Sequence, residues 1–156
     1  MRVLIVEDDM VVAGCLKPAV VEAGHQVVGL AADRDSAIAL LGSARVHLAL
    51  IDLGLADGLT GLEVARAAAD QGVPAVLTTG HRSLVPDDFA GAVGVIAKPY
   101  SPAHIAAALA FVAEGPEACG TTPVGLELSP CWTAPRRARQ PAPMSASVRA
   151  SSAPSQ

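Results

Sequence analysis

The stretch VHLALIDLGLADGLTGLEVARAAAD, residues 46–70, decides the fold. Its first six residues are apolar apart from His47, which is typical of a strand buried on both faces of a parallel sheet. The run ends at Asp52, a loop containing Gly54 and Gly58 follows, and residues 61–70 have the apolar spacing of a helix. This stretch therefore predicts a strand, a loop and a helix, with a carboxylate at the carboxyl end of the strand.

The same alternation extends through most of the chain. Five strands are expected, at residues 2–6, 26–30, 46–51, 75–79 and 93–97. Five helices are expected between and after them, at residues 10–22, 36–43, 61–70, 86–91 and 102–113, of which the fourth is the most weakly patterned. Strands that alternate with helices in this way predict an α/β fold in which helices cover both faces of a parallel sheet.

The composition excludes several classes of protein. The chain has 156 residues, of which 51% are hydrophobic and only 3% aromatic, so its core must be aliphatic. A net charge of -4 argues against a broad basic surface for nucleic acid. No uncharged apolar run approaches the roughly 18 residues that a membrane span needs. Three cysteines without a CxxC spacing favour neither disulfides nor zinc, and they suggest a cytoplasmic protein.

The composition changes near Gly115. Residues 1–114 carry the strand–helix pattern, whereas residues 115–156 are rich in Pro, Ala, Ser and Arg. Such a tail offers little apolar surface to bury, so we expect it to be disordered, and removing it should not change the melting temperature. It is also too short and too irregular for a helix-turn-helix output domain, so no DNA-binding domain is expected.

Polar residues stand at the carboxyl ends of four predicted strands. Glu7 and Asp8 follow the first strand, Asp52 the third, Thr79 ends the fourth, and Lys98 follows the fifth. In an open α/β sheet these ends meet at one edge, where ligand sites form. Clustered carboxylates repel one another unless a cation lies among them, and oxygen ligands suit Mg²⁺. A lysine and a hydroxyl beside such a metal site would suit a phosphoryl group.

Four segments carry a resemblance to a known family. They are VLIVEDD at 3–9, LALIDL at 48–53 with Gly58 and Gly61 after it, PAVLTTG at 74–80 and AKPY at 97–100. In this order the chain resembles the receiver domain of bacterial two-component response regulators. The resemblance spans residues 1–114 and implies a flavodoxin-like, doubly wound, five-stranded parallel sheet of order 2-1-3-4-5 with five helices.

The resemblance also implies roles for the polar residues. Asp52 would be the phosphoacceptor, Lys98 would pair with a phosphoryl oxygen, and Thr79 would be the switch hydroxyl. The implied ligands of Mg²⁺ are Glu7, Asp8, Asp52 and the backbone carbonyl of Gly54. Such a protein is a signalling receiver, not a turnover enzyme. In this family the peptide bond between Lys98 and Pro99 is cis.

The implied partners are proteins. A histidine kinase or a histidine phosphotransfer protein would donate the phosphoryl group, and a protein target would bind the surface of the fourth helix, fifth strand and last helix. Two residues depart from the family pattern. Gly54 has no side chain to position a hydrolytic water, and Val95 stands where many members have an aromatic. His81, two residues past Thr79, could modulate dephosphorylation or be an ordinary loop residue.

Three alternatives remain open at this stage. An aspartate-nucleophile phosphatase would use the same carboxylate, but such enzymes usually have a second Asp two residues later, where this chain has Gly54. A receiver fragment of a longer regulator is the second alternative. A pseudo-receiver that never takes phosphate is the third, and the complete set of polar residues argues against it. Asp9 and Asp57 are expected to serve as a helix cap and a turn residue rather than as metal ligands.

Overall fold

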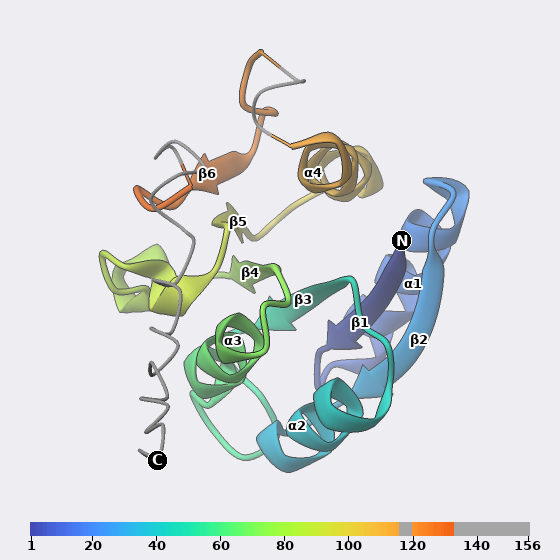
Figure 1. Ribbon diagram of the computed structural model, residues 1–156, viewed down its shortest axis with the longest axis vertical. Helices are drawn as coiled ribbons and strands as arrows, with labels where there is room; N and C mark the ends of the chain where they lie inside the picture. Colours follow the sequence, from blue (N-terminus) through green and yellow to red (C-terminus); the bar gives the residue numbers. More distant parts are fainter. Residues whose placement is uncertain (116–119, 133–156) are drawn as a thin grey trace, which may run out of the picture.

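A six-stranded sheet forms the centre of the protein in a computed structural model that describes residues 1–115 and 120–132 (Figure 1). The strand order is β2-β1-β3-β4-β5-β6, in which the first five strands are parallel and β6 is antiparallel to β5. The parallel part has the order that the family resemblance implies. The strands are β1 Arg2–Val6, β2 Gln26–Ala31, β3 Leu48–Asp52, β4 Ala75–Thr79, β5 Gly94–Ala97 and β6 Leu126–Leu128.

Helices cover both faces of the sheet. α1 and α4 lie on one face, and α2 and α3 lie on the other (Figure 1). Three of the four begin at a side-chain cap: Asp9, Asp33 and Ser101 each accept a hydrogen bond from a backbone amide of the first turn. The helices are α1 Met10–Glu22, α2 Arg34–Ser43, α3 Gly61–Asp70 and α4 Pro102–Glu114.

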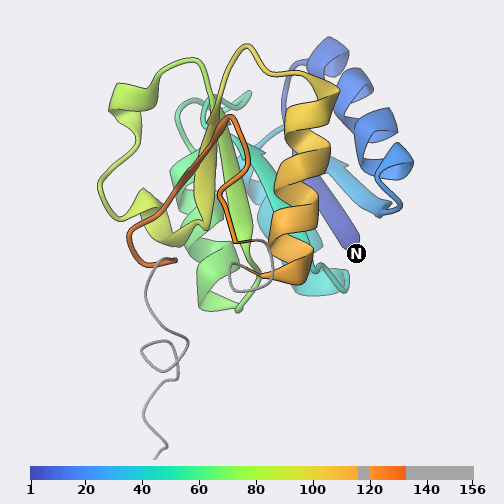
Figure 2. The same cartoon turned by 90° about the horizontal axis from the view of Figure 1, so that it is seen from above.

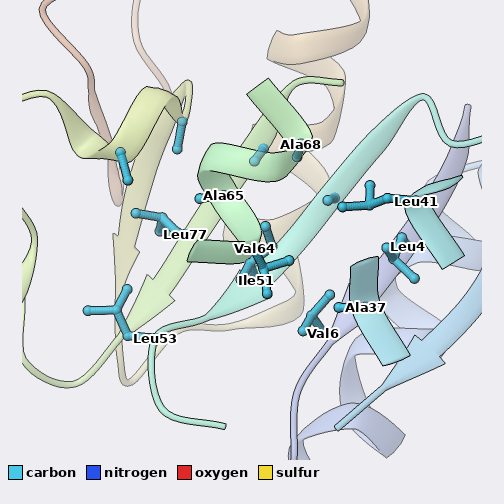
Figure 3. Close-up of a cluster of buried hydrophobic side chains, with 14 of the residues drawn as sticks. Leu4, Val6, Ala37, Leu41, Ile51, Leu53, Val64, Ala65, Ala68 and Leu77 are labelled. Atoms are coloured by element: carbon cyan, nitrogen blue, oxygen red, sulfur yellow. The ribbon is translucent and has the colours of Figure 1, made fainter. Parts of the chain in front are cut away.

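Two aliphatic clusters, one on each face, make up the core. In β1, Leu4 and Val6 join the cluster under α2 and α3, whereas Val3 and Ile5 join the cluster under α1 and α4. Successive side chains of a strand point to opposite faces, so one strand contributes to both clusters. Figure 3 shows the first cluster, in which side chains of the sheet meet Ala37 of α2 and Ala65 of α3. Small alanines on the helices allow the helices to approach the sheet closely.

The expected fourth helix near residues 86–91 is wrong. The described residues contain four α-helices, and residues 82–91 form two single 3₁₀ turns, η1 Arg82–Leu84 and η2 Phe89–Gly91. Phe89 and Ala90 have φ of 52° and 51°, a left-handed conformation that ends a helix. Phe89 is nevertheless buried. The backbone of residues 82–91 therefore places the Phe89 side chain in the core and does not continue as a helix.

The expectation that the chain is disordered from residue 115 is wrong for part of the tail. Residues 126–128 form β6 against β5, and Leu126 is buried. The centre of the Trp132 ring lies 6.2 Å from the centre of the Phe111 ring in α4. A few isolated apolar residues achieve this, too few to give a periodic signal in the sequence. An unchanged melting temperature after removal of the tail is therefore no longer expected. The prediction of disorder for residues 116–119 and 133–156 lies outside the described residues.

Among the described residues, every helix is too short or too polar to cross a lipid bilayer.

A glycine at the start of α3 fixes the position of the end of β3. A Cβ on Gly61 would overlap the carbonyl oxygen of Asp52 and lie 2.8 Å from Cα of Leu53. The backbone of α3 therefore touches the backbone that carries Asp52, and no larger residue fits without a shift.

We expect Gly61→Ala to lower the free energy of unfolding by about 1–3 kcal/mol, the usual cost of overpacking a tight site. Gly14→Ala is the matched control, because no atom lies within 4 Å of a Cβ at that position in α1. Alanine is the better helix former, so this variant should be more stable by about 0.5–1 kcal/mol. Urea unfolding of both variants measures the difference, and equal stability of the two would contradict the close approach.

Candidate functional site

The carboxyl ends of four neighbouring strands bring polar side chains to one edge of the sheet. Strand pairing places Asp52 of β3 beside Thr78 of β4, and Thr79 beside Ala97 of β5. Lys98 follows directly after β5, and Glu7 and Asp8 follow directly after β1. The residues predicted to share a site therefore all lie at this edge.

An acidic cluster forms the base of the site. One carboxylate oxygen from each of Glu7, Asp8 and Asp52 lies within 4.8 Å of the others. The side chain of Glu7 is only 1% exposed and that of Asp52 13%, whereas Asp8 is exposed. Three hard oxygen donors at this separation, one of them open to solvent, suit a magnesium-sized cation that keeps some of its waters.

Lys98 joins two of these carboxylates. Its Nζ donates hydrogen bonds to Oδ2 of Asp52 at 2.8 Å and to Oε2 of Glu7 at 3.1 Å. Burial alone would lower the pKa of Lys98, but the hydrogen bonds to Asp52 and Glu7 outweigh burial and raise it, so the ammonium stays charged. Three carboxylates with one ammonium leave a negative excess that a divalent cation would neutralise. The peptide bond between Lys98 and Pro99 is cis, as the resemblance implies.

The surroundings of Glu7 disfavour its negative charge. Burial raises the pKa of Glu7, and the negative charge of Asp52 raises it further, while the hydrogen bond from Lys98 opposes both. The ionised form of Glu7 therefore costs folding free energy in the absence of a cation. The hydrogen bond from Lys98 alone does not compensate this cost.

Thr79 links the site to the loop that follows β4. The side chain is buried, and its Oγ1 accepts a hydrogen bond of 2.9 Å from the backbone N–H of His81. The His81 side chain is exposed. Gly54 lies two residues past Asp52 in the loop that leaves β3, and no atom lies within 4 Å of a Cβ there. Gly54 therefore leaves open space beside Asp52, where any other residue would place a side chain.

Asp9 and Asp57 have the local roles that the sequence predicts. Asp9 caps α1 by accepting hydrogen bonds from the amides of Val11 and Val12. Asp57 accepts hydrogen bonds from the Thr60 hydroxyl and the Arg34 amide, and the first of these lowers the pKa of Asp57. Neither residue belongs to the acidic cluster.

Sequence reasoning missed Arg82. This residue forms two hydrogen bonds with Glu127 of β6, although the two lie 45 residues apart. No spacing rule connects them, because the contact depends on the antiparallel pairing of β6 with β5.

Residues 3–110 match the response regulator receiver domain. The chain belongs to this family. It is 32% identical over 111 residues to the phyllosphere-induced regulator PhyR of Methylorubrum extorquens, a match that covers 69% of the chain and 42% of that protein. The chain thus spans less than half the length of this relative.

Two solved structures of PhyR proteins are also similar. The receiver domain of PhyR from Erythrobacter litoralis superimposes with a TM-score of 0.66 at 26% identity, over 72% of this chain and 88% of that one. A variant of the anti-anti-sigma factor PhyR from Bartonella quintana gives a TM-score of 0.63 at 25% identity, over 71% of this chain and 47% of that one. As a receiver domain the chain is a signalling module, not a turnover enzyme.

We expect Glu7→Gln to stabilise the metal-free protein at pH 7, because the neutral amide avoids the burial penalty that raises the pKa of Glu7. The pKa of Glu7 is raised in the folded state, so stability falls as the pH rises from the ordinary glutamate value through the folded value. Glutamine removes this loss and leaves Lys98 its bond to Asp52. Thermal melts with EDTA measure the gain.

The same melts with Mg²⁺ should show the gain shrink or reverse, because the variant offers a cation one carboxylate fewer in the acidic cluster. Glu22→Gln, an exposed charge change on α1, is the control and should behave as wild type in both buffers. A lower melting temperature of Glu7→Gln than of wild type in EDTA would contradict the cost of burying the Glu7 charge.

Proposed function

We propose that Asp52 accepts a phosphoryl group from a phosphohistidine of a histidine kinase or histidine phosphotransfer protein, in a reaction that requires Mg²⁺. The observation that carries the proposal is the placement of the Lys98 ammonium on Asp52 and Glu7, with Asp8 beside them. This arrangement presents a carboxylate nucleophile next to a fixed positive charge and an oxygen-ligand metal site.

The transfer exchanges one phosphorus bond for another. An oxygen of Asp52 attacks the phosphorus atom, the bond from phosphorus to the donor's imidazole nitrogen breaks, and the imidazole leaves with its electron pair. Lys98 pairs with a phosphoryl oxygen as a point charge. Glu7, Asp8, Asp52 and the carbonyl of Gly54 would hold Mg²⁺, which would offset the negative charge of the phosphoryl oxygens. Water later hydrolyses the acyl phosphate and restores the carboxylate.

The surface beside the site supports a protein donor. Met10 and Val11, which directly follow the acidic residues, are 75% and 76% exposed at the start of α1. Large apolar side chains at such exposure favour contact with a partner protein over contact with water. A donor that packs on the first turn of α1 would bring its phosphohistidine over Asp52.

The output is a change in protein binding. We propose that Thr79 turns its hydroxyl toward the phosphoryl group, which changes the loop around His81. Because one similar protein is described as an anti-anti-sigma factor, an anti-sigma factor is the first target to test. That the sequence is the receiver part of a longer regulator remains an alternative proposal. Membership of a family of signalling modules counts against the phosphatase alternative.

Incubation with acetyl phosphate and Mg²⁺ should add one base-labile phosphoryl group, visible by intact mass spectrometry. Asp52→Asn should abolish the addition because the amide is no nucleophile. Asp33→Asn, which keeps the N-cap of α2, is the matched control and should be labelled as wild type. Labelling that survives Asp52→Asn, or steady hydrolysis of unrelated phosphate esters, would count against the proposal.

Mg²⁺ should bind weakly to the wild type and stabilise it by mass action. Asp8→Ala should abolish measurable binding, since it removes the exposed carboxylate of the cluster. Titration calorimetry measures this, and Asp9→Asn is the control because it keeps the cap of α1 but lies outside the cluster. Equal binding by wild type and Asp8→Ala would contradict the site.

A further inference from the structure

Residues 120–132, here called the strap, cover the outer edge of β5. Figure 2 shows this segment in orange running alongside β5, with α4 on its other side. Three residue pairs join β5 and β6, and the amide of Ser129 donates to the carbonyl of Val93 at 2.9 Å. Without the strap, β5 would present an unpaired edge.

The strap lies very close to β5 at one position. A Cβ on Gly94 would be 2.5 Å from the carbonyl oxygen of Glu127 and 3.0 Å from the side chain of Leu126. Gly94 therefore permits this approach, and any side chain there would push the strap away. Leu126 is buried and Trp132 packs on Phe111, so the strap also closes part of the apolar core.

An ion pair ties the strap to the loop after β4. The Arg82 guanidinium donates to both carboxylate oxygens of Glu127, at 2.6 and 2.8 Å, and lies 4.8 Å from the centre of the Phe89 ring. The hydrogen bonds from Arg82 lower the pKa of Glu127. The Glu127 side chain is 55% exposed, so this pair adds little stability, but its two-point geometry is specific.

The loop that forms the ion pair with the strap also donates a hydrogen bond to Thr79, the last residue of β4. The amide of His81 donates to the Thr79 hydroxyl, and Arg82 is the next residue. A short path therefore runs from the site to the strap: Thr79 to His81 by a hydrogen bond, along one peptide bond to Arg82, and through the ion pair to Glu127. Two residues before Glu127 the strap also approaches α4, because a Cβ on Gly125 would lie 3.3 Å from the His104 ring.

We propose that the strap is an internal occupant of a binding surface on the edge of β5, and that phosphorylation of Asp52 releases it. The surface fits an extended segment of a partner protein with an acidic residue between two apolar ones. Leu126, Glu127 and Leu128 have this pattern: the strand pairs with β5, and its carboxylate meets Arg82. A strand added to an exposed edge is a common mode of peptide recognition.

Release follows from a difference in contacts between two states. This step rests on the proposed phosphorylation of Asp52. If the Thr79 hydroxyl turns to the phosphoryl group, it no longer accepts from His81, and the turn that carries Arg82 loses its anchor. The strap is then held by a ladder of three residue pairs, one exposed ion pair and the packing of Leu126 and Trp132, whereas four or five residue pairs join the parallel strands. By linkage, a docked strap opposes phosphorylation to the same extent that phosphorylation opposes docking.

The test uses the full chain, beryllofluoride with Mg²⁺ as the acyl-phosphate mimic, and a fluorescein-labelled peptide of residues 123–132 with Ser in place of Cys131. Activated wild type should show altered Trp132 emission and faster amide exchange at residues 93–96. It should also bind the peptide roughly tenfold more tightly than unactivated protein, a typical size for coupled sites. ¹⁹F NMR of the bound mimic shows separately whether the acceptor site is filled.

Variants separate the strap from the phosphoryl chemistry. Glu127→Gln weakens the strap but keeps Arg82, so it should bind the peptide more tightly than wild type without any mimic. Glu22→Gln, the same charge change on α1, should not. Gly94→Ala should displace the strap and change the Trp132 emission without any mimic. It should also fail to bind the peptide, because the Cβ blocks any strand on this edge of β5.

Two results would contradict the proposal that the strap is a releasable occupant of the edge of β5. One is a filled acceptor site with unchanged Trp132 emission and unchanged exchange at residues 93–96, which would make β6 a fixed sixth strand. The other is equal peptide binding by Glu127→Gln and wild type. Failure of the proposed function would give a different result, because the mimic would not bind. Glu127→Gln would still bind the peptide, which would support the strap as an occupant of this edge of β5.

Discussion

The contact of Lys98 with Asp52 and Glu7 is the interaction on which the rest of the site depends. Three carboxylates meet at one edge because parallel strands place their carboxyl ends together, and without a cation they would repel one another. Lys98 relieves part of this repulsion and holds Asp52 in place. The remaining negative charge makes the site receptive to a divalent cation, so the electrostatic strain of the folded protein and its proposed chemistry have the same origin.

Much of the fold could be predicted from the sequence, because the parallel strands carry strong local signals. The run at residues 48–51 is buried on both faces, and its uninterrupted apolar pattern reflects this. The gathering of Glu7, Asp8, Asp52 and Lys98 was also predictable, since strand ends in this topology converge. Their roles came from the family resemblance, because spacing alone does not tell a phosphoacceptor from a metal ligand.

The parts that could not be predicted depend on single long-range contacts. The connection at residues 82–91 is shaped by the burial of Phe89, with left-handed backbone at Phe89 and Ala90, and no helical periodicity competes with it. β6 is three residues long: Gly94 leaves room for it, Leu126 is buried, and Glu127 meets Arg82. Composition marked this segment as part of a disordered tail, since neither a glycine's free space nor a distant ion pair is visible in local sequence.

The position of the single tryptophan has a consequence for how unfolding is observed. Trp132 lies at the end of the strap, outside the parallel sheet, and the core that holds the sheet together is aliphatic. Intrinsic fluorescence therefore follows the attachment of one short segment, whereas circular dichroism follows the helices and the sheet. If the two signals change at different temperatures, the protein does not unfold in one cooperative step, and the gap between them measures how independently the segment detaches.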